Sequence, residues 1–231
     1  MNIINHKNII KTEDGSSTFY IPSLKETYHS VHGAVNESMH VFIDKGAKYF
    51  TNERDNLRII EVGFGTGLNA LLTYIESERI NVKSIDYYAL EPYPISNDQL
   101  EQLNYTSIID KKDGDAETFF EKIHSFQEEG YFEMNNFRFH FHKLKIQDFI
   151  SDLKFDLVYF DAFAPHAQPE MWEYSVFIDL FNMMDPNSIL VTYCAKGNFK
   201  RALKKAGFKV EELEGPPGKR EMVRGMKEGG S

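Results

Sequence analysis

Three glycines at alternate positions follow a short apolar run, and this arrangement limits the folds open to the chain. Residues 57–62 predict a strand, residues 63–67 read Gly-Phe-Gly-Thr-Gly, and residues 68–80 predict an amphipathic helix. Glycine lacks a Cβ, so the backbone of such a turn can pass close to a ligand that faces the helix N-terminus. The unit predicts a parallel α/β fold with a nucleotide-bearing ligand at the glycine turn.

The spacing of these glycines favours S-adenosylmethionine over a dinucleotide. The dinucleotide fingerprint is Gly-x-Gly-x-x-Gly, whereas here the third glycine comes one residue earlier and the acidic Glu61 precedes the first. Glu91 directly follows a second predicted strand, residues 84–90, where a carboxylate can accept both hydroxyls of an adenosine ribose. Pro92 and Pro94 end that strand. We therefore expect S-adenosylmethionine as the cofactor.

The remaining elements continue the alternation and end it in a hairpin. Helical stretches alternate with predicted strands at 137–141, 155–160 and 188–194, which implies a parallel sheet. The last two strands, 208–213 and 221–226, are joined by Gly-Pro-Pro-Gly and predict an antiparallel hairpin at the sheet edge. We expect an α/β fold: a Rossmann-like S-adenosylmethionine-dependent methyltransferase sheet with an antiparallel C-terminal hairpin and a small N-terminal β-hairpin extension.

The N-terminal residues predict an appendage to this core. Residues 7–21 read as a β-hairpin with Glu-Asp-Gly at its turn, and residues 41–50 suggest a short amphipathic helix. We expect an N-terminal extension at 1–55 packed on the core, a methyltransferase domain at 56–228, and a tail at 229–231.

Asp161 directly follows the fourth predicted strand. Ligands of open parallel sheets lie beyond the carboxyl ends of the strands, so Asp161 is expected to point at the reacting centre. A carboxylate there suits an amine nucleophile, because it can hold the N–H groups, aim the lone pair and stabilise the cation that forms. The alternative is that Asp161 caps the next helix, which approaches Trp172.

Composition excludes several classes of protein. The 231 residues include one cysteine, Cys194, so an internal disulfide is impossible, and no apolar run is long enough to span a bilayer. We expect a cytoplasmic location, and a buried structural thiol rather than the nucleophile of a pyrimidine C5 methyltransferase. Without a supporting cysteine or a tight carboxylate cluster, we expect no bound metal. The histidines that could suggest one are His29, His32, His40, His140 and His142.

Charge is distributed unevenly along the chain. The net charge of -9 argues against indiscriminate coating of nucleic acid, which is driven by basic side chains. Residues 196–227 nevertheless hold ten basic and four acidic side chains, so this segment carries +6 and the remainder -15. The segment is either a solvated helix face or a docking surface for a polyanion.

Several blocks of the sequence resemble the methyltransferase part of MnmC, a family of tRNA wobble-uridine modification proteins. The resemblance spans nearly the whole chain, and each block lies at the same place in chain order. The matching blocks are 28–30 (YHS), 37–43 (ESMHVFI), 63–69 (GFGTGLN), 91–94 (EPYP), 161–165 (DAFAP), 169–172 (PEMW), 206–208 (AGF) and 218–222 (GKREM).

The resemblance implies transfer of a methyl group from S-adenosylmethionine to the exocyclic amine of 5-aminomethyl-2-thiouridine at the tRNA wobble position. It agrees with the amine chemistry inferred for Asp161, and it gives tRNA, rather than a membrane, as the partner. Bifunctional members of the family carry a C-terminal flavin-dependent oxidase, and we expect no flavin domain in this chain. Two alternatives stay open: methylation of a protein or small-molecule amine, and a non-catalytic relative that binds the cofactor.

The resemblance also implies roles for individual residues. Members of the family show Gly-Asp after the third strand, near the adenine, where this sequence has Leu144-Lys145 and then Gln147-Asp148. We therefore place adenine contacts there. The expected catalytic residues are Asp161 and Tyr28. The expected cofactor-binding residues are Glu37, Glu61, Gly63, Phe64, Gly65, Thr66, Gly67, Asn69, Glu91, Pro92, Gln147 and Asp161, and the expected substrate-binding residues are Phe163, Pro165, Trp172, Lys219 and Arg220.

Overall fold

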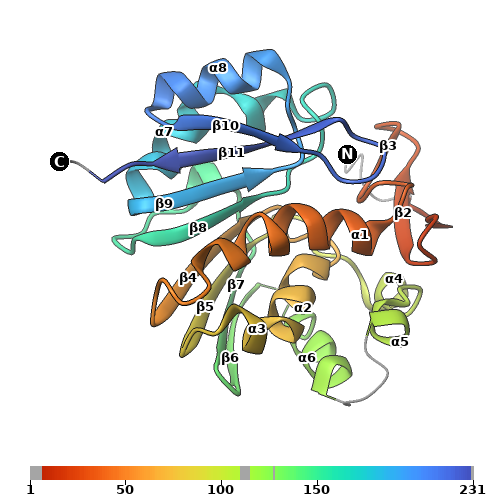
Figure 1. Ribbon diagram of the computed structural model, residues 1–231. Coiled ribbons are helices and arrows are strands. Elements are labelled where there is room, and N and C mark those ends of the chain that lie inside the picture. Colours follow the sequence, from red (N-terminus) through yellow and green to blue (C-terminus); the bar gives the residue numbers. More distant parts are fainter. Residues whose placement is uncertain (1–6, 110–114, 127, 230–231) are drawn as a thin grey trace.

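The computed structural model describes residues 7–109, 115–126 and 128–229, and an eight-stranded sheet lies at its centre (Figure 1). The strand order is β10-β11-β9-β8-β4-β5-β7-β6. β4, β5, β7, β8 and β9 pair in parallel, whereas β6 and β11 pair antiparallel with their neighbours. The strands are β4 (Asn56–Val62), β5 (Ser84–Leu90), β6 (Glu129–Met134), β7 (Phe137–His142), β8 (Phe155–Phe160), β9 (Met184–Thr192), β10 (Lys209–Glu214) and β11 (Glu221–Lys227).

This topology confirms the predicted Rossmann-like fold. The predicted parallel strands all lie in the sheet, and the last two strands form the expected antiparallel hairpin, with β10 at one edge. β11 enters between β10 and β9, so the hairpin closes that side of the sheet. The parallel strands point their carboxyl ends to the same edge, toward the right in Figure 1.

Helices cover the two faces of the sheet in separate groups. Figure 1 shows α2, α3 and α6 on one side of the strands and α7 and α8 on the other. The helices are α1 (Ala34–Ser38), α2 (Leu68–Ile75), α3 (Ser77–Ile80), α4 (Asn97–Leu100), α5 (Tyr105–Ile109), α6 (Asp115–Ile123), α7 (Tyr174–Met183) and α8 (Gly197–Ala206), with a π-helical turn η1 (Met39–Asp44) and 3-10 turns η2 (Ala47–Phe50), η3 (Ile146–Asp148) and η4 (Pro169–Trp172).

The central strands are buried on both faces, which explains their uninterrupted apolar sequence. In β8, Leu157 and Tyr159 pack with the cluster under α2 and α6, whereas Val158 and Phe160 pack with the cluster under α7 and α8. Because side chains alternate along a strand, a strand with a helix layer on each face needs apolar residues at every position. This core, which packs on both faces of the sheet, fixes the positions of the strand ends. It therefore also fixes the positions of the residues that follow them.

A second, small sheet forms the N-terminal extension. β1 (Asn8–Lys11) and β2 (Ser17–Ile21) make the predicted hairpin, and β3 (Glu26–Thr27) adds a short third strand that was not predicted. In the turn, Asp14 accepts hydrogen bonds from the Thr12 hydroxyl at 2.7 Å and the Ser16 amide at 3.0 Å. Figure 1 shows this sheet beyond the carboxyl edge of the main sheet, beside the β10–β11 loop.

The structure differs from the predicted elements in three places. β6 was missed, although Asn135 in its turn to β7 adopts the left-handed conformation that asparagine tolerates. The predicted helix 68–80 is broken at Glu76, whose buried carboxylate pairs with Lys48 at 3.1 Å and with Arg79 at 2.5 Å. The sequence also predicts a helix that presents Phe119, Phe120, Ile123 and Phe126 on one face, but α6 stops at Ile123.

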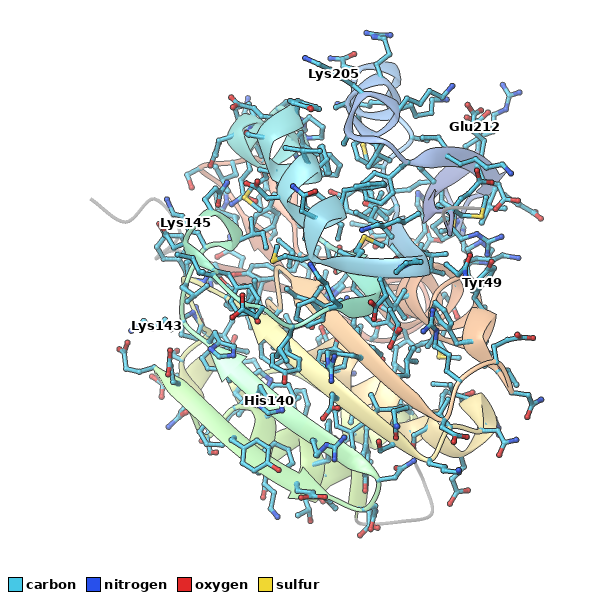
Figure 2. All side chains as sticks on the ribbon, turned by 90° about the vertical axis from the view of Figure 1, so that its left-hand side faces the viewer. Tyr49, His140, Lys143, Lys145, Lys205 and Glu212 are labelled. Atoms are coloured by element: carbon cyan, nitrogen blue, oxygen red, sulfur yellow. The ribbon has the colours of Figure 1, made fainter. Side chains whose placement is uncertain are left out.

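One half of the sheet carries aromatic and histidine side chains on the face opposite α2 and α6. His140 of β7 stacks on Tyr88 of β5 with ring centroids 4.2 Å apart, and the Tyr131 ring lies 4.8 Å from His140. Figure 2 shows His140 on this face of the sheet, in the lower part of the view. His142 also lies against Tyr88, so two of the histidines that could suggest a metal belong to a stacked surface layer.

Two predictions about domain organisation are not tested by the structure. In the predicted tail, residues 230–231 lie outside the described residues, and the domain boundary at 55/56 stays a prediction.

Candidate active site

A cavity of about 740 Å³ opens at the carboxyl edge of the main sheet. Its walls are the segments that follow β4, β5, β7 and β8, together with residues 26–31 of the extension. Cavities of this size hold small-molecule ligands, and open α/β sheets place such ligands beyond the carboxyl ends of their strands. The cavity therefore lies where the glycine turn and the strand-end carboxylates place a ligand.

Gly63 and Gly65 bring the turn after β4 close to two cavity walls. Their φ angles are +90° and +54°, in the left-handed region that favours glycine. A Cβ on Gly63 would lie 2.5 Å from the carbonyl oxygen of Asp161. A Cβ on Gly65 would lie 3.1 Å from the Tyr28 ring. A side chain on Gly63 would thus collide with backbone, and one on Gly65 would require the Tyr28 ring to move.

Glu91 connects the end of β5 to the glycine turn. Its Oε2 accepts a hydrogen bond from the Gly65 amide at 2.9 Å, and its Oε1 accepts one from the Tyr93 amide at 2.8 Å. Burial raises the pKa of the Glu91 carboxyl, while the two amide donors and the charge of Lys7 oppose that rise. The carboxylate lines the cavity and can accept hydroxyl donors from a ligand.

The segment after β7 forms a further wall on which the predicted adenine contacts lie. Residues 144–148 all line the cavity, and Gln147 donates a hydrogen bond to the Met171 sulfur at 3.6 Å. Figure 2 shows Lys145 on this segment, beyond the end of β7. Leu144 and the buried Ile146 give this wall an apolar part suited to a flat base.

Asp161 lies at the end of β8, on the cavity wall. Its Oδ2 accepts a hydrogen bond from the Asn69 side-chain amide at 2.9 Å. Burial and then the nearby Glu37 carboxylate raise the pKa of Asp161 to about 7, against the opposing effects of Asn69 and Lys219. A carboxyl with this pKa exchanges its proton near neutral pH, as a group that handles an amine must.

The helix-cap alternative for Asp161 is wrong. The next helical turn, η4, begins eight residues later at Pro169, and Gln168 occupies its cap position. The intervening loop is held by other side chains: Tyr193 donates from its hydroxyl to the Ala162 carbonyl at 2.8 Å, and the Trp172 indole N–H donates to the Phe163 carbonyl at 2.8 Å. Asp161 is therefore placed by β8, and its side chain is left to face the cavity.

Glu37 and Lys219 form an ion pair beside Asp161. Lys219 Nζ lies 2.5 Å from Glu37 Oε1 and 3.8 Å from the centroid of the Tyr193 ring. Glu37 Oε2 accepts a hydrogen bond from the Ser30 amide at 2.7 Å. Both residues line the cavity, so the N-terminal extension and the β10–β11 loop meet on the wall near Asp161.

Tyr28 and Phe163 face each other across the cavity wall with ring centroids 5.1 Å apart. Burial, reinforced by the charge of Glu91, raises the pKa of the Tyr28 phenol, so it stays protonated at neutral pH. Glu26 Oε1 and His166 Nε2 lie 2.8 Å apart and add a polar contact between the extension and the loop after β8. The extension therefore contacts both the glycine turn and the Asp161 loop.

Several predicted site residues do not line the cavity. Glu61 and Asn69 are buried behind the wall, and Gly67 starts α2. Trp172 is buried and supports the loop through its bond to Phe163, while the Arg220 side chain is 93% exposed and lies near Glu221. The predicted residues that do line it are Tyr28, Glu37, Gly63, Phe64, Gly65, Thr66, Glu91, Pro92, Gln147, Asp161, Phe163 and Lys219; Pro165 is absent from the lining.

The cavity also contains residues for which the sequence predicted no place in this site. Tyr193 directly follows β9 and stacks its ring under the Lys219 ammonium. His29 is buried, and burial lowers its pKa to about 4, so it is neutral near Thr18 and Thr66. Glu26 lies on β3. Of these residues, only Tyr193 had a feature in its local sequence that could have indicated the site, namely its position at the end of an apolar run. The fold brings the others to the cavity.

The basic segment 196–227 is partly neutralised by its own acidic residues. Lys200 pairs with Glu212 at 2.7 Å, and Arg224 pairs with Glu211 at 2.6 Å. Arg201, Lys204 and Lys205 are exposed on α8, and Figure 2 shows Lys205 pointing outward. We call these three exposed residues of α8 the basic stripe.

Features typical of metal sites and membrane spans are absent from the described residues. In this part of the chain, no three side chains among His, Cys, Asp and Glu are grouped so that they could hold a metal ion. None of the helices in the same part is long and apolar enough to cross a membrane. Cys194 is buried, and burial raises the pKa of its thiol, as expected for a structural cysteine.

Comparisons of this chain with known proteins agree on one protein family. A family model described as S-adenosyl-L-methionine-dependent methyltransferase matches residues 113–228, about half of the chain. The tRNA 5-methylaminomethyl-2-thiouridine biosynthesis bifunctional protein MnmC of Burkholderia thailandensis is 28% identical over 236 residues, covering 94% of this chain and 34% of the relative. The MnmC protein of Leptospira borgpetersenii is 30% identical over 216 residues, covering 87% and 32%. The chain spans about a third of the length of these curated relatives.

Among solved structures, MnmC2 from Aquifex aeolicus superposes with a TM-score of 0.74 at 23% identity, covering 95% of this chain and 70% of that one. This likeness concerns the fold.

The match of the family model to half of the chain shows that the chain belongs to the S-adenosyl-L-methionine-dependent methyltransferase family. It is an enzyme whose cofactor is S-adenosylmethionine, and the part it resembles in the curated relatives is the methyltransferase part of MnmC.

The cavity fits this cofactor. The Glu91 carboxylate lines the cavity and can accept from ribose hydroxyls, the glycines of the turn leave the adjoining space unfilled, and Leu144 and Ile146 provide apolar surface for a flat base. The carboxylates in the cavity lining, among them Glu37, Glu91 and Asp161, suit a positively charged sulfonium centre.

Proposed function

We propose that this methyltransferase methylates the exocyclic amine of 5-aminomethyl-2-thiouridine at the wobble position of tRNA. The observation that carries the proposal is the position of Asp161, a carboxylate with a pKa of about 7 in the same cavity as the glycine turn and Glu91. The names of the MnmC relatives supply the identity of the acceptor, since they refer to 5-methylaminomethyl-2-thiouridine.

We assign the cofactor to the half of the cavity built from the segments after β4, β5 and β7. In this assignment Glu91 accepts the ribose hydroxyls, and the turn backbone passes beside the methionine and ribose. When bound, S-adenosylmethionine supplies an electrophilic methyl group on a sulfonium centre. The residues proposed to surround the cofactor are Gly63, Phe64, Gly65, Thr66, Glu91, Pro92 and Gln147.

Asp161 is assigned to the acceptor. Its ionised carboxylate accepts a hydrogen bond from an amine N–H, which fixes the nitrogen and directs the lone pair toward the cofactor half. The same charge stabilises the positive nitrogen that methylation produces, and the carboxylate can take up the proton released from it. Tyr28 and Phe163 form the aromatic wall beside this point, and the protonated Tyr28 hydroxyl serves as a neutral donor.

The charge of the cavity supports an amine acceptor. Among the residues that the structure describes, six carboxylate side chains and two lysines line it. An aminomethyl group is mostly protonated at neutral pH, so an acidic wall attracts it before it loses its proton. The lining carboxylates are Glu26, Glu37, Glu91, Asp148, Asp161 and Glu170, and the lysines are Lys145 and Lys219.

The substrate proposal is tested by mass spectrometry of tRNA nucleosides after incubation with the protein and isotope-labelled S-adenosylmethionine. The substrate is tRNA from cells that accumulate the 5-aminomethyl form, and tRNA lacking that modification is the control. We expect one labelled methyl group on the aminomethyl nucleoside and none in the control. Cofactor binding by calorimetry without any transfer to tRNA would move the acceptor to a protein or a small-molecule amine.

A further inference from the structure

Glu61 and Asn69 are buried polar residues for which the cavity gives no direct role. Glu61 is 0% exposed and Asn69 is 2% exposed, and neither lines the cavity. The side-chain amide nitrogen of Asn69 lies 2.8 Å from Glu61 Oε1 and 2.9 Å from Asp161 Oδ2. A single amide group thus joins the buried acid before the glycine turn to the carboxylate on the cavity wall.

The direction of the Asn69 amide is fixed by its surroundings. Its NH₂ group has two hydrogens, and each is directed at a carboxylate oxygen. Rotation of the amide by half a turn would place its oxygen against both carboxylates, which are acceptors when ionised. Asn69 Oδ1 is buried and has no hydrogen-bond partner among the described residues, so the NH₂ contacts determine the orientation.

Glu61 is itself held from the far side. The Tyr87 hydroxyl of β5 donates to Glu61 Oε2 at 2.8 Å, so both carboxylate oxygens are used. The resulting chain of hydrogen bonds runs from β5 through Glu61 of β4 and Asn69 of α2 to Asp161 after β8. All four elements belong to the rigid core of the main sheet or to the helix packed on it.

We propose that Asn69 and Glu61 are positioning residues that act on methyl transfer through Asp161. Asn69 holds Oδ2 of Asp161 and thereby directs Oδ1 toward the acceptor amine. Glu61 holds the Asn69 amide in the orientation that this requires. The inference rests on the proposed function of Asp161, and it assigns neither residue a contact with the cofactor.

The electrostatics of the group support this arrangement. Burial raises the pKa of Glu61 well above its usual value, and the charges of Asp161 and Glu91 add to the rise. A hydrogen bond from Asn69 favours the ionised form of Asp161, which is the form that accepts an amine N–H. The groups that act on Asp161 are Asn69 from α2, Glu37 from α1 and Lys219 from the β10–β11 loop; Asp161 in turn raises the pKa of Tyr193 and of Tyr87.

A double-mutant cycle on methyl transfer tests the proposal. Asn69→Ala should lower kcat by about 10- to 100-fold, the effect of removing a hydrogen bond to a charged group, with cofactor affinity unchanged. In an Asp161→Asn background the same substitution should lower kcat by less than about threefold, because the group through which it acts is already neutral. Multiplicative losses, or a weaker cofactor affinity in Asn69→Ala, would overturn the proposal.

The pH profile separates this role from a merely structural one. With the Asn69 donor removed, the ionised form of Asp161 is less favoured, so the rising limb of kcat/KM should move to higher pH. Glu61→Gln should move it in the same direction by a smaller amount, because a neutral amide oxygen holds the Asn69 NH₂ group less firmly than a carboxylate does. A limb that stays at its wild-type pH in both variants would contradict the proposal.

A cofactor-free measurement uses unfolding of the apo protein at pH 8. Asn69→Ala and Asp161→Asn should show coupled effects on the free energy of unfolding. Thr73→Val is the matched control, since Thr73 lies one turn along α2 and is fully buried, and its hydroxyl bonds to the Asn69 backbone carbonyl and to Tyr159 but not to Asp161. Its effect should be additive with Asp161→Asn. If Asn69→Ala does not fold, Asn69→Ser retains a short polar side chain and replaces it in both cycles.

The outcomes also distinguish this inference from the proposed function. If Asp161→Asn keeps normal turnover, the assignment of Asp161 as a catalytic residue fails. If Asp161→Asn loses turnover and Asn69→Ala multiplies the loss, only the positioning role fails.

Discussion

The two halves of the cavity are built in different ways. The half that we assign to the cofactor includes the glycine turn and Glu91, where the Gly65 amide donates a hydrogen bond to a carboxylate 26 residues away in the chain. The acceptor half is formed by Asp161, Glu37, Lys219 and Tyr193, and its Glu37–Lys219 ion pair connects residues 182 positions apart. The first half is a local strand-end structure, whereas the second exists only when the whole chain has folded.

The two halves should respond differently to substitution. Backbone amides and left-handed glycines hold the cofactor half, so substitutions there act through backbone conformation and space. Side-chain charges dominate the acceptor half, so substitutions there act through charge and protonation. Variants in the two halves should therefore separate cofactor affinity from turnover.

The largest expected effect is that of Gly65→Asp on cofactor binding. The new side chain would meet the Tyr28 ring, in a conformation with φ of +54°, and would add a carboxylate beside Glu91. We expect calorimetry to detect no binding. Gly15→Asp is the matched control, because Gly15 has φ of +85° and nothing within 4 Å of a built Cβ. A folded Gly65→Asp protein with wild-type affinity would remove the glycine turn from the site.

The second largest expected effect is on turnover, and it concerns Asp161 in the half of the cavity that we assign to the acceptor. Asp161→Asn keeps the shape of the side chain and removes its charge, so single-turnover methyl transfer should slow by about 10²- to 10³-fold, the scale of one electrostatic stabiliser. Cofactor affinity should change little. Asp161→Asn with near-normal turnover would mean that the two halves are not divided between cofactor and chemistry in this way.

The same carboxyl predicts a pH dependence of stability. Its folded pKa of about 7 lies above its usual value of 3.8, so the native state holds a proton that the unfolded state releases. This stabilising contribution is present below pH 3.8 and is lost as the pH rises to about 7, by up to about 4 kcal/mol. Asp161→Asn should therefore unfold at a higher temperature than wild type at pH 8, and at a similar temperature at pH 4.

A smaller effect is expected for Glu91→Ala. Loss of charge-assisted bonds to the ribose hydroxyls should weaken cofactor binding by about 1–3 kcal/mol, or about 10- to 100-fold. Glu91→Gln should lose less, because it retains an oxygen that can accept from the Gly65 amide. The acceptor KM, measured at saturating cofactor, should stay at its wild-type value in both variants. A change there would show that the halves are coupled through the glycine turn.

The position of the glycine turn and of Glu91 at one cavity could be predicted from the sequence, because the signals for both are local. Glycines at alternate positions, an acidic residue at a strand end and apolar runs of strand length are all visible within short windows. Their positions in space follow from the rule that parallel strands end at one edge of the sheet. Asp161 was found by the same rule, since it directly follows β8.

The rest of the site required tertiary structure. Nothing near Lys219 in the sequence indicates Glu37, and the pair forms because the β10–β11 loop meets α1. Glu61 and Asn69 lie in a typical cofactor motif, yet β4 and α2 direct both side chains into the core. β6 was missed because it is an edge strand with charged residues at exposed positions, which weakens its apolar pattern.

The smallest expected effect concerns the basic stripe on α8, which lies in neither half. If the stripe docks tRNA, replacing Arg201, Lys204 and Lys205 with Ala should raise the tRNA KM about three- to tenfold. The salt dependence of tRNA binding should flatten by about one unit for every phosphate that the variant no longer neutralises.

Lys200 separates docking from a general effect of charge. It lies on the same helix but is half-buried and pairs with Glu212 and Glu221, so Lys200→Ala alone should leave the salt slope nearly unchanged. Lys209→Ala is a second control, because Lys209 is exposed on β10 beside Glu228. Cofactor affinity should be normal in all these variants, since none of the substituted residues lines the cavity. An equal loss of salt dependence from Lys209→Ala would indicate that overall charge, rather than the stripe, attracts tRNA. An unchanged salt slope in the triple variant would show that the basic stripe is a solvated surface that does not dock tRNA.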